Sequence, residues 1–183
     1  MTTAILTAAL LLFAPQQLTP ETAMAHAKAA QGAADATGLP ATLLLAVSYA
    51  ETRYEPLSLS RVQCSRGKCR RVTGIWTGSI APLGSRGPYF CGPLQSEDTM
   101  DWQTCQRVRV DLAAGYLDGA REILEWERAA PCRRLDADKR IECGLAGFNA
   151  GWRGAREGTN SYARTVLRTA ARLRRALERV LDA

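Results

Sequence analysis

The sequence predicts a mainly α-helical domain in which an irregular segment, with room for a small β-sheet, is inserted after a buried helix. Two observations lead to this fold class. On both sides of residues 56–98, apolar residues recur at the three- and four-residue steps of a helix face. Residues 56–98 are instead rich in Gly, Pro, Ser and Arg and contain short β-favouring stretches such as 71–77, a pattern typical of loops and hairpins.

Length and composition fit one globular domain. The chain has 183 residues, of which 46% are hydrophobic and 23% charged, so it can bury a core and does not have the composition of a disordered protein. No apolar run approaches the roughly 18 residues of a transmembrane helix. The net charge is +6, and nearly all the cations are arginines. A basic surface would suit an anionic partner such as a cell-wall polymer, lipid headgroups or nucleic acid.

Residues 1–18 fit two roles. Residues 4–14 have the length of a signal-peptide core, and Ala23-Met24-Ala25 could serve as a cleavage site. No Lys or Arg precedes this core, however, and a polar gap at 15–21 separates it from that site. The alternative is an ordinary first helix packed on the domain. The domain itself spans 19–183, with the insertion at about 56–100.

Two helices should precede the insertion. Thr19 and Pro20 form a typical helix start, and Gly38 ends this Ala-rich helix. The second helix runs from Ala41 to about Arg53. Its centre, residues 43–47, is apolar on every side, which predicts a helix buried on all sides.

Three helical stretches should follow the insertion: about 104–130, 140–148, and a last helix to about Leu181 capped by Thr159 or Asn160. The last helix carries a basic stripe opposite its apolar face, formed by Arg164, Arg168, Arg172, Arg175 and Arg179. A solvated helix face is the ordinary interpretation. The alternative is a patch for an anionic wall or membrane surface. Nucleic-acid binding is disfavoured, because no recognised motif or interleaved aromatic residues support it.

Six cysteines form three local couples, for which we predict the disulfides Cys64–Cys69, Cys91–Cys105 and Cys132–Cys143, since each couple flanks or closes a loop. A zinc site is disfavoured, because there is one close cysteine pair and a single histidine. Free buried thiols are the other alternative. Disulfides imply an exported protein, periplasmic or extracellular, or one on a virion surface.

Glu51 is the candidate catalytic residue. It lies in the last turn of the buried helix, where burial and the negative end of the helix dipole should both raise the pKa of its carboxyl. A carboxylic acid that stays protonated near neutral pH can act as the general acid of a glycosidase. The alternative is a glutamate that simply reaches solvent at a helix end.

Five segments, in order over about residues 40–166, resemble the motifs of the soluble lytic transglycosylase family. Residues 43–54 are similar to its signature helix, which ends in Glu-Ser and an aromatic residue, and Gly92-Pro93-Leu94-Gln95 is similar to its Gly-Leu-Met-Gln turn. Residues 113–117 resemble its Tyr-Leu helix. Residues 146–151 resemble its Ala-Tyr-Asn-Ala-Gly motif, and residues 162–166 resemble its closing Tyr-x-x-x-Val helix.

This resemblance implies a lysozyme-like domain that cleaves the MurNAc–GlcNAc bond of peptidoglycan glycan strands and leaves a 1,6-anhydro end. Glu51 would act first as acid and then as base, so one carboxylate would suffice. The resemblance also implies a site for Gln95, Asn149 and Tyr162, with Tyr162 facing Glu51. Tyr162 also heads the apolar face of its helix, and turn geometry alone could account for Gln95 and Asn149.

The sequence departs from the family pattern at several positions. Thr52 replaces the Ser and keeps its hydroxyl, whereas Phe148 replaces a Tyr and loses one; both are assigned to the substrate site. Pro93 stiffens the turn. Trp76, in the long insertion, would either stack on a sugar or pin the insertion to the domain.

Several alternatives stay open. A second carboxylate near the site, from among Glu55, Glu97, Asp98 and Asp101, would make the protein a hydrolytic muramidase like the related goose-type lysozymes. A silent wall-glycan-binding or structural module is a further alternative.

His26, the sole histidine, is expected to be exposed on the Ala-rich helix. The chemistry needs no metal or cofactor, and we expect a monomer.

Overall fold

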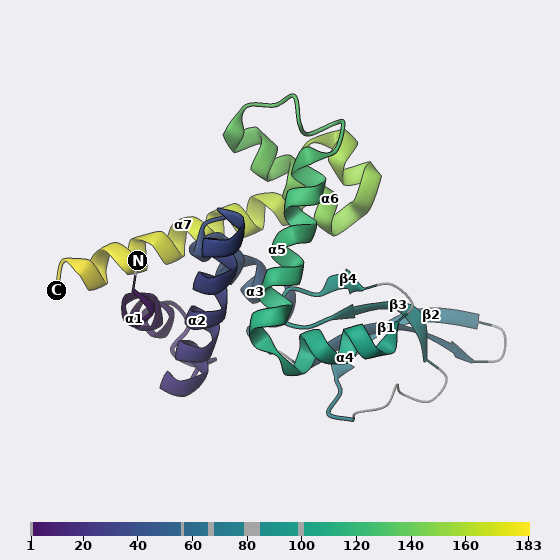
Figure 1. Cartoon of the computed structure of the whole chain (residues 1–183), viewed down its shortest axis with the longest axis horizontal. Helices are drawn as coiled ribbons and strands as arrows, with labels where there is room; N and C mark the ends of the chain where they lie inside the picture. Colours follow the sequence, from purple (N-terminus) through teal and green to yellow (C-terminus); the bar gives the residue numbers. More distant parts are fainter. Residues whose placement is uncertain (1, 56, 66–67, 79–84, 99–100) are drawn as a thin grey trace.

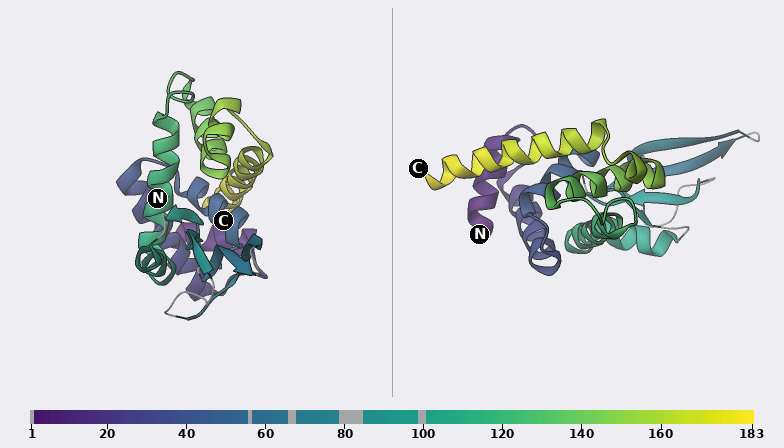
Figure 2. Two further views of the ribbon diagram at one scale, coloured as in Figure 1. Left: turned by 90° about the vertical axis from the view of Figure 1, so that its right-hand side faces the viewer. Right: turned by 90° about the horizontal axis from the view of Figure 1, so that it is seen from above.

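The computed structural model describes residues 2–55, 57–65, 68–78, 85–98 and 101–183, and it has the predicted architecture. In this part of the chain, seven helices surround one main core, and a small antiparallel sheet is inserted between the third and fourth helices (Figure 1). The sheet projects from one end of the helical body, whereas both chain termini lie at the other end (Figure 2). The mainly α class with a β-containing insertion is therefore confirmed.

The elements follow the chain in three groups. Three helices come first: α1 (Thr3–Phe13), α2 (Pro20–Thr37) and α3 (Ala41–Thr52). The insertion contributes four strands: β1 (Ser58–Ser65), β2 (Lys68–Ile75), β3 (Ser85–Cys91) and β4 (Ser96–Asp98). Four helices complete the chain: α4 (Trp102–Val110), α5 (Leu112–Arg128), α6 (Ala137–Glu157) and α7 (Ser161–Leu181).

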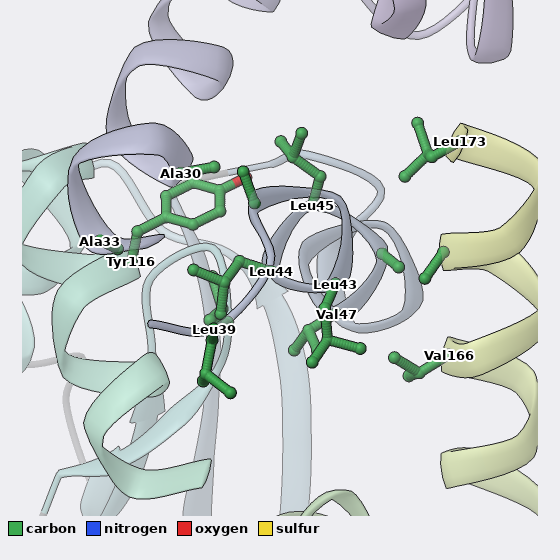
Figure 3. Close-up of a cluster of buried hydrophobic side chains, with 14 of the residues drawn as sticks. Ala30, Ala33, Leu39, Leu43, Leu44, Leu45, Val47, Tyr116, Val166 and Leu173 are labelled. Carbon is green, nitrogen blue, oxygen red and sulfur yellow. The ribbon is translucent and has the colours of Figure 1, made fainter. Parts of the chain in front are cut away.

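Helix α3 is the centre of the main core. Leu44, Leu45 and Val47 are all fully buried, on different sides of the helix. Tyr116 of α5 lies on one side of α3, and Val166 and Leu173 of α7 lie on the other (Figure 3). A fully buried aliphatic side chain stabilises a fold by about 1.5–3 kcal/mol, so α3 gives the residues in its last turn a fixed position.

The helices before α3 begin and end as their sequences predict. Thr19 caps α2 through a capping box with Thr22, and Gly38 ends the helix in the left-handed conformation. Residues 3–13 form α1, which packs on α2 and α7 through the buried Leu6 and Leu10.

The sheet has the strand order β2-β1-β3-β4, with each neighbouring pair antiparallel. Strands β1 and β2 form a hairpin in which Ser58 is paired with Ile75 and Ser65 with Lys68. A second, smaller core lies between the sheet and α4 and consists of Leu59, Tyr89, Cys91, Cys105 and Val108, with Trp76 and Trp102 packed against it.

The prediction of one helix over 104–130 is wrong. The chain forms two helices there, because Asp111 adopts an extended backbone (φ −106°, ψ 101°) and caps α5 by accepting a hydrogen bond from the Ala114 amide at 3.1 Å. Helix α6 is longer than predicted and continues across a kink at Gly151, which has a positive φ of 59°. Of the two candidate caps for α7, Asn160 is the residue used.

Two of the three predicted disulfides are present. Cys91–Cys105 joins the end of β3 to α4, and Cys132–Cys143 closes the connection between α5 and α6. Cys64 and Cys69 are paired residues of the β1–β2 ladder, and their side chains lie outside the described part of the structure. Two disulfides are compatible with an exported protein.

Candidate active site

Glu51 stands one residue before the end of the central helix, and its side chain is partly exposed. The two residues after α3 have left-handed backbones, with φ values of 55° at Arg53 and 68° at Tyr54. Non-glycine residues rarely adopt this conformation, and such strain tends to occur at functional sites. The chain turns sharply here and leads into β1, so Glu51 lies where the helical body meets the insertion.

Tyr162, in the first turn of α7, lies beside Glu51. Burial raises the pKa of the Tyr162 phenol well above its usual value, and the charge of Glu51 and a hydrogen bond to it raise this pKa further. The hydroxyl has no partner at full hydrogen-bond geometry among the described residues, so this hydrogen bond is long or poorly aligned. Catalytic hydrogen bonds in unliganded sites often have this character and tighten around the substrate.

The turn at residues 92–95 is tied to both sides of the site. Thr52 Oγ1 lies 3.0 Å from the Ser48 carbonyl oxygen and 3.2 Å from that of Pro93, so it joins the last turn of α3 to this turn. Gln95 is buried and donates from Nε2 to the carbonyl of Ser58 at 3.0 Å. In this structure, Thr52 and Gln95 therefore hold backbone segments together around Glu51.

Close packing between the turn at residues 92–95 and the helices α4 and α5 depends on three glycines. A Cβ atom on Gly115 would lie 2.6 Å from Pro93, and one on Gly119 would lie 2.7 Å from Leu94. Gly92 has a φ of 75°, and a Cβ atom there would lie 2.6 Å from the Val108 carbonyl oxygen. The turn can thus approach α4 and α5 this closely only because these three residues are glycines.

The expectation that His26 is exposed is wrong, since only 2% of this residue is accessible. Its Nε2 lies 3.1 Å from the Tyr54 carbonyl oxygen and its Nδ1 lies 2.9 Å from the Tyr116 hydroxyl. A carbonyl can only accept, so Nε2 carries the proton and Tyr116 donates to Nδ1. Burial lowers the pKa of His26 to about 4, which keeps the ring neutral at pH 7.

His26 therefore holds the left-handed segment that follows Glu51, a positioning role that sequence reasoning missed. A signal was present in the sequence: His26 falls on the same face of α2 as Ala23, Ala27, Ala30 and Ala33, all of them buried. A histidine on that face enters the core between Tyr116 of α5 and Tyr54, which follows α3.

Asn149 is exposed on α6 and is linked to the start of α7. Its Oδ1 accepts a hydrogen bond from Asn160 Nδ2 at 3.4 Å, and Asn160 caps the helix that carries Tyr162. Phe148 is half-buried and packs on the main core. Trp76 packs on the smaller core of the insertion, and its amide donates to the Leu57 carbonyl.

Among the carboxylates considered as a second acid or base, two are engaged locally. Asp101 caps α4 and Glu55 accepts from the Leu57 amide. The side chains of Glu97 and Asp98 lie outside the described part. Glu122 of α5 is a further carboxylate that sequence reasoning missed: its charge acts on Tyr162, as that of Glu51 does. The sequence contains a signal for this position, because Glu122 falls on the same face of α5 as Gly115 and Gly119.

A groove of about 460 Å³ lies between α3 and α7. Its lining includes Ala50, the chain neighbour of Glu51, and Tyr162, which interacts with Glu51, while Arg53 and Arg172 contribute positive charge. Tyr49, Ser161, Thr165 and Thr169 complete its described lining.

Among the described residues, no cluster of three or more His, Cys, Asp or Glu side chains could hold a metal ion. No helix in this part of the chain has the length and apolarity needed to cross a membrane.

Comparison with known proteins found no relative: no family model, no curated protein and no solved structure matches the chain.

Proposed function

We propose that the protein is a peptidoglycan lytic transglycosylase that uses Glu51 as its acid and base. The observation that carries this proposal is the pairing of Glu51, in the last turn of the central buried helix, with the hydroxyl of Tyr162, which lies 111 residues further along the chain, as the family resemblance implies. A partly exposed carboxyl next to a buried phenol is suited to proton transfer with a ligand.

The proposed reaction has two proton transfers. Glu51 first donates its proton to the glycosidic oxygen while the bond between this oxygen and C1 of MurNAc breaks. The Glu51 carboxylate then removes the proton from the C6 hydroxyl of the same sugar, whose oxygen bonds to C1 and closes the 1,6-anhydro ring. Glu51 regains its proton, and the reaction neither consumes nor releases water.

The neighbouring residues have distinct roles in this proposal. Tyr162 keeps its proton, because its pKa is raised, and so it can donate a hydrogen bond to the Glu51 carboxylate and hold its orientation. Asn149, which is exposed, offers an amide to the sugar. Thr52, Gln95 and His26 hold the backbone around the site, and Phe148 and Trp76 support its walls through packing.

One observation favours a second candidate, a hydrolytic muramidase. Glu122 places a second carboxylate close enough to act on Tyr162, and a water molecule between two carboxyl groups is the arrangement used by inverting glycosidases. In that case the product would carry a reducing end, and both Glu51 and Glu122 would be needed.

Mass spectrometry of soluble products from purified peptidoglycan tests the proposal. The wild type should release anhydro-muropeptides, Glu51→Gln should release none, and Glu178→Gln, a matched change at an exposed position of α7, should behave as the wild type. Reducing muropeptides that disappear in Glu122→Gln would instead establish the muramidase. No product from folded wild type, tested on several wall types, would leave a glycan-binding module and overturn both enzymatic assignments.

A further inference from the structure

Two arginines of the groove between α3 and α7 are supported by aromatic rings. The Arg53 guanidinium lies over the Tyr49 ring, with its Cζ atom 4.1 Å from the ring centroid, and that of Arg172 lies 5.2 Å from the Phe13 centroid. The two rings contact each other edge to face, with 5.0 Å between their centroids. This stack joins α1, α3 and α7, and it holds two cations that would otherwise be highly mobile.

The charge in this groove is not balanced locally. None of its described lining residues is acidic, and neither Arg53 nor Arg172 forms an ion pair within the described ranges. A second hollow of about 300 Å³ continues along α7 from Arg172 and adds Arg175 and Arg179. The basic stripe of α7 is thus exposed, as predicted, and part of it lines a concave surface.

Hydroxyl groups complete the lining. Ser161, Thr165 and Thr169 contribute three from α7, and Tyr162 leads to Glu51. Thr165 Oγ1 already donates to the Ser161 carbonyl oxygen at 2.8 Å and accepts from Arg168 at 3.1 Å. The planar guanidinium groups of Arg53 and Arg172 match the geometry of carboxylates, which accept several hydrogen bonds at once.

We infer that this groove binds the anionic stem peptide of the MurNAc residue whose bond lies at Glu51, and that Arg53 and Arg172 pair with its carboxylates. The inference rests on the proposed function. The stem peptide is attached to the lactyl group of MurNAc, so it must leave the sugar next to the catalytic carboxyl. Ala50 and Tyr162, the two lining residues that neighbour Glu51, bring the groove close to this point, and its lining extends along α7 as far as Arg172.

A binding experiment tests this assignment without catalysis. The protein carries Glu51→Gln, and the probes are a soluble glycan fragment that bears stem peptides and the same fragment after an amidase has removed them. We expect the stem-bearing fragment to bind about tenfold more tightly in this background, the effect of ~1.4 kcal/mol of added contacts. Adding Arg53→Gln and Arg172→Gln should abolish the difference and leave binding of the peptide-free fragment unchanged.

The matched control is Arg133→Gln with Arg134→Gln, which removes the same charge from exposed residues between α5 and α6 and should keep the tenfold difference. Arg53→Lys with Arg172→Lys keeps the charge and loses the planar stacked groups, so it should keep less of the difference than the control. Circular dichroism checks that every variant is folded.

The outcomes separate the two proposals. Equal binding of both fragments by the Glu51→Gln protein would overturn the stem-peptide inference and leave the proposed function standing. An equal loss in the control pair would also overturn it, since net charge alone would then explain the effect. Binding of neither fragment, together with arginine-dependent binding to phosphatidylglycerol vesicles, would overturn the proposed function and assign the arginines to a membrane.

Discussion

The helical body and the sheet insertion meet at the end of α3, and they are held in place by different physical means. The helical body surrounds α3 with fully buried side chains from α2, α5 and α7, and it positions Glu51 and Tyr162 through packing. The insertion shares a core of five buried residues with α4, which contributes Cys105 and Val108, and it is also held by a disulfide and by side-chain hydrogen bonds to backbone carbonyls. The comparison indicates that stability resides mainly in the body, whereas the shape of the site also depends on the insertion.

The largest effect on stability should come from the centre of the body. Leu44→Ala removes a fully buried side chain on α3, and such changes cost about 2–5 kcal/mol because they leave a cavity. Urea unfolding should show a fall of about 4 kcal/mol in the free energy of unfolding. Leu12→Ala, where 59% of the residue is exposed, serves as control and should change it by less than about 0.5 kcal/mol. A similar loss at both positions would contradict the central role of α3.

The two disulfides sharpen the comparison, because one lies in each region. Their cysteines are 14 and 11 residues apart, and closing loops of this size stabilises a protein by about 3 kcal/mol. Replacing either pair with alanines should lower the melting temperature to a similar extent. Under the proposed function, only the loss of Cys91–Cys105 should also lower muropeptide release strongly, since Gly92 begins the turn that Thr52 ties to the end of α3. Equal activity in both double variants would show that the insertion does not shape the site.

Acid should lower the stability of the folded protein through His26. The pKa of His26 is about 4 in the folded protein and about 6.5 in the unfolded chain, because burial disfavours the charged ring. As the pH falls from about 6.5 to 4, the unfolded chain binds a proton that the folded protein does not. The free energy of unfolding therefore falls by up to ~3 kcal/mol over this range, and His26 causes no further loss below about pH 4. Urea unfolding at pH 7.5 and 4.5 should show this loss in the wild type and less of it in His26→Gln; an equal pH dependence would refute it.

The smallest effect on stability should come from the hydroxyl of Tyr162. It has no well-aligned partner within the described structure, so Tyr162→Phe should change the free energy of unfolding by less than about 1 kcal/mol. The rate of muropeptide release should nevertheless fall by about 10–100-fold, because Glu51 loses its orienting donor. Tyr116→Phe provides the opposite case: its buried hydroxyl bonds His26, so stability should fall more than the rate. A Tyr162→Phe enzyme with full activity would assign Tyr162 to the core.

Elements defined by local pattern were predictable from the sequence. Short-range spacing and capping residues predict the capped α2, the end of α3 just after Glu51 and the amphipathic α7. These signals depend only on residues that are close together in the sequence. The break at Asp111 was missed, because the apolar period continues across it from Val108 to Leu112. An aspartate that can cap a new helix ended α4 there.

The sequence by itself determined that the domain is mainly helical, which helix is buried, and that a glutamate stands in the last turn of that helix. Tertiary structure alone decided what lies around that glutamate. His26 meets Tyr116 across 90 residues, Glu122 and Tyr162 come from different helices, and Phe13 and Tyr49 jointly support Arg53 and Arg172. The physical reason is that periodicity shows which face of a helix is buried, whereas the partner of that face depends on how all the helices pack together.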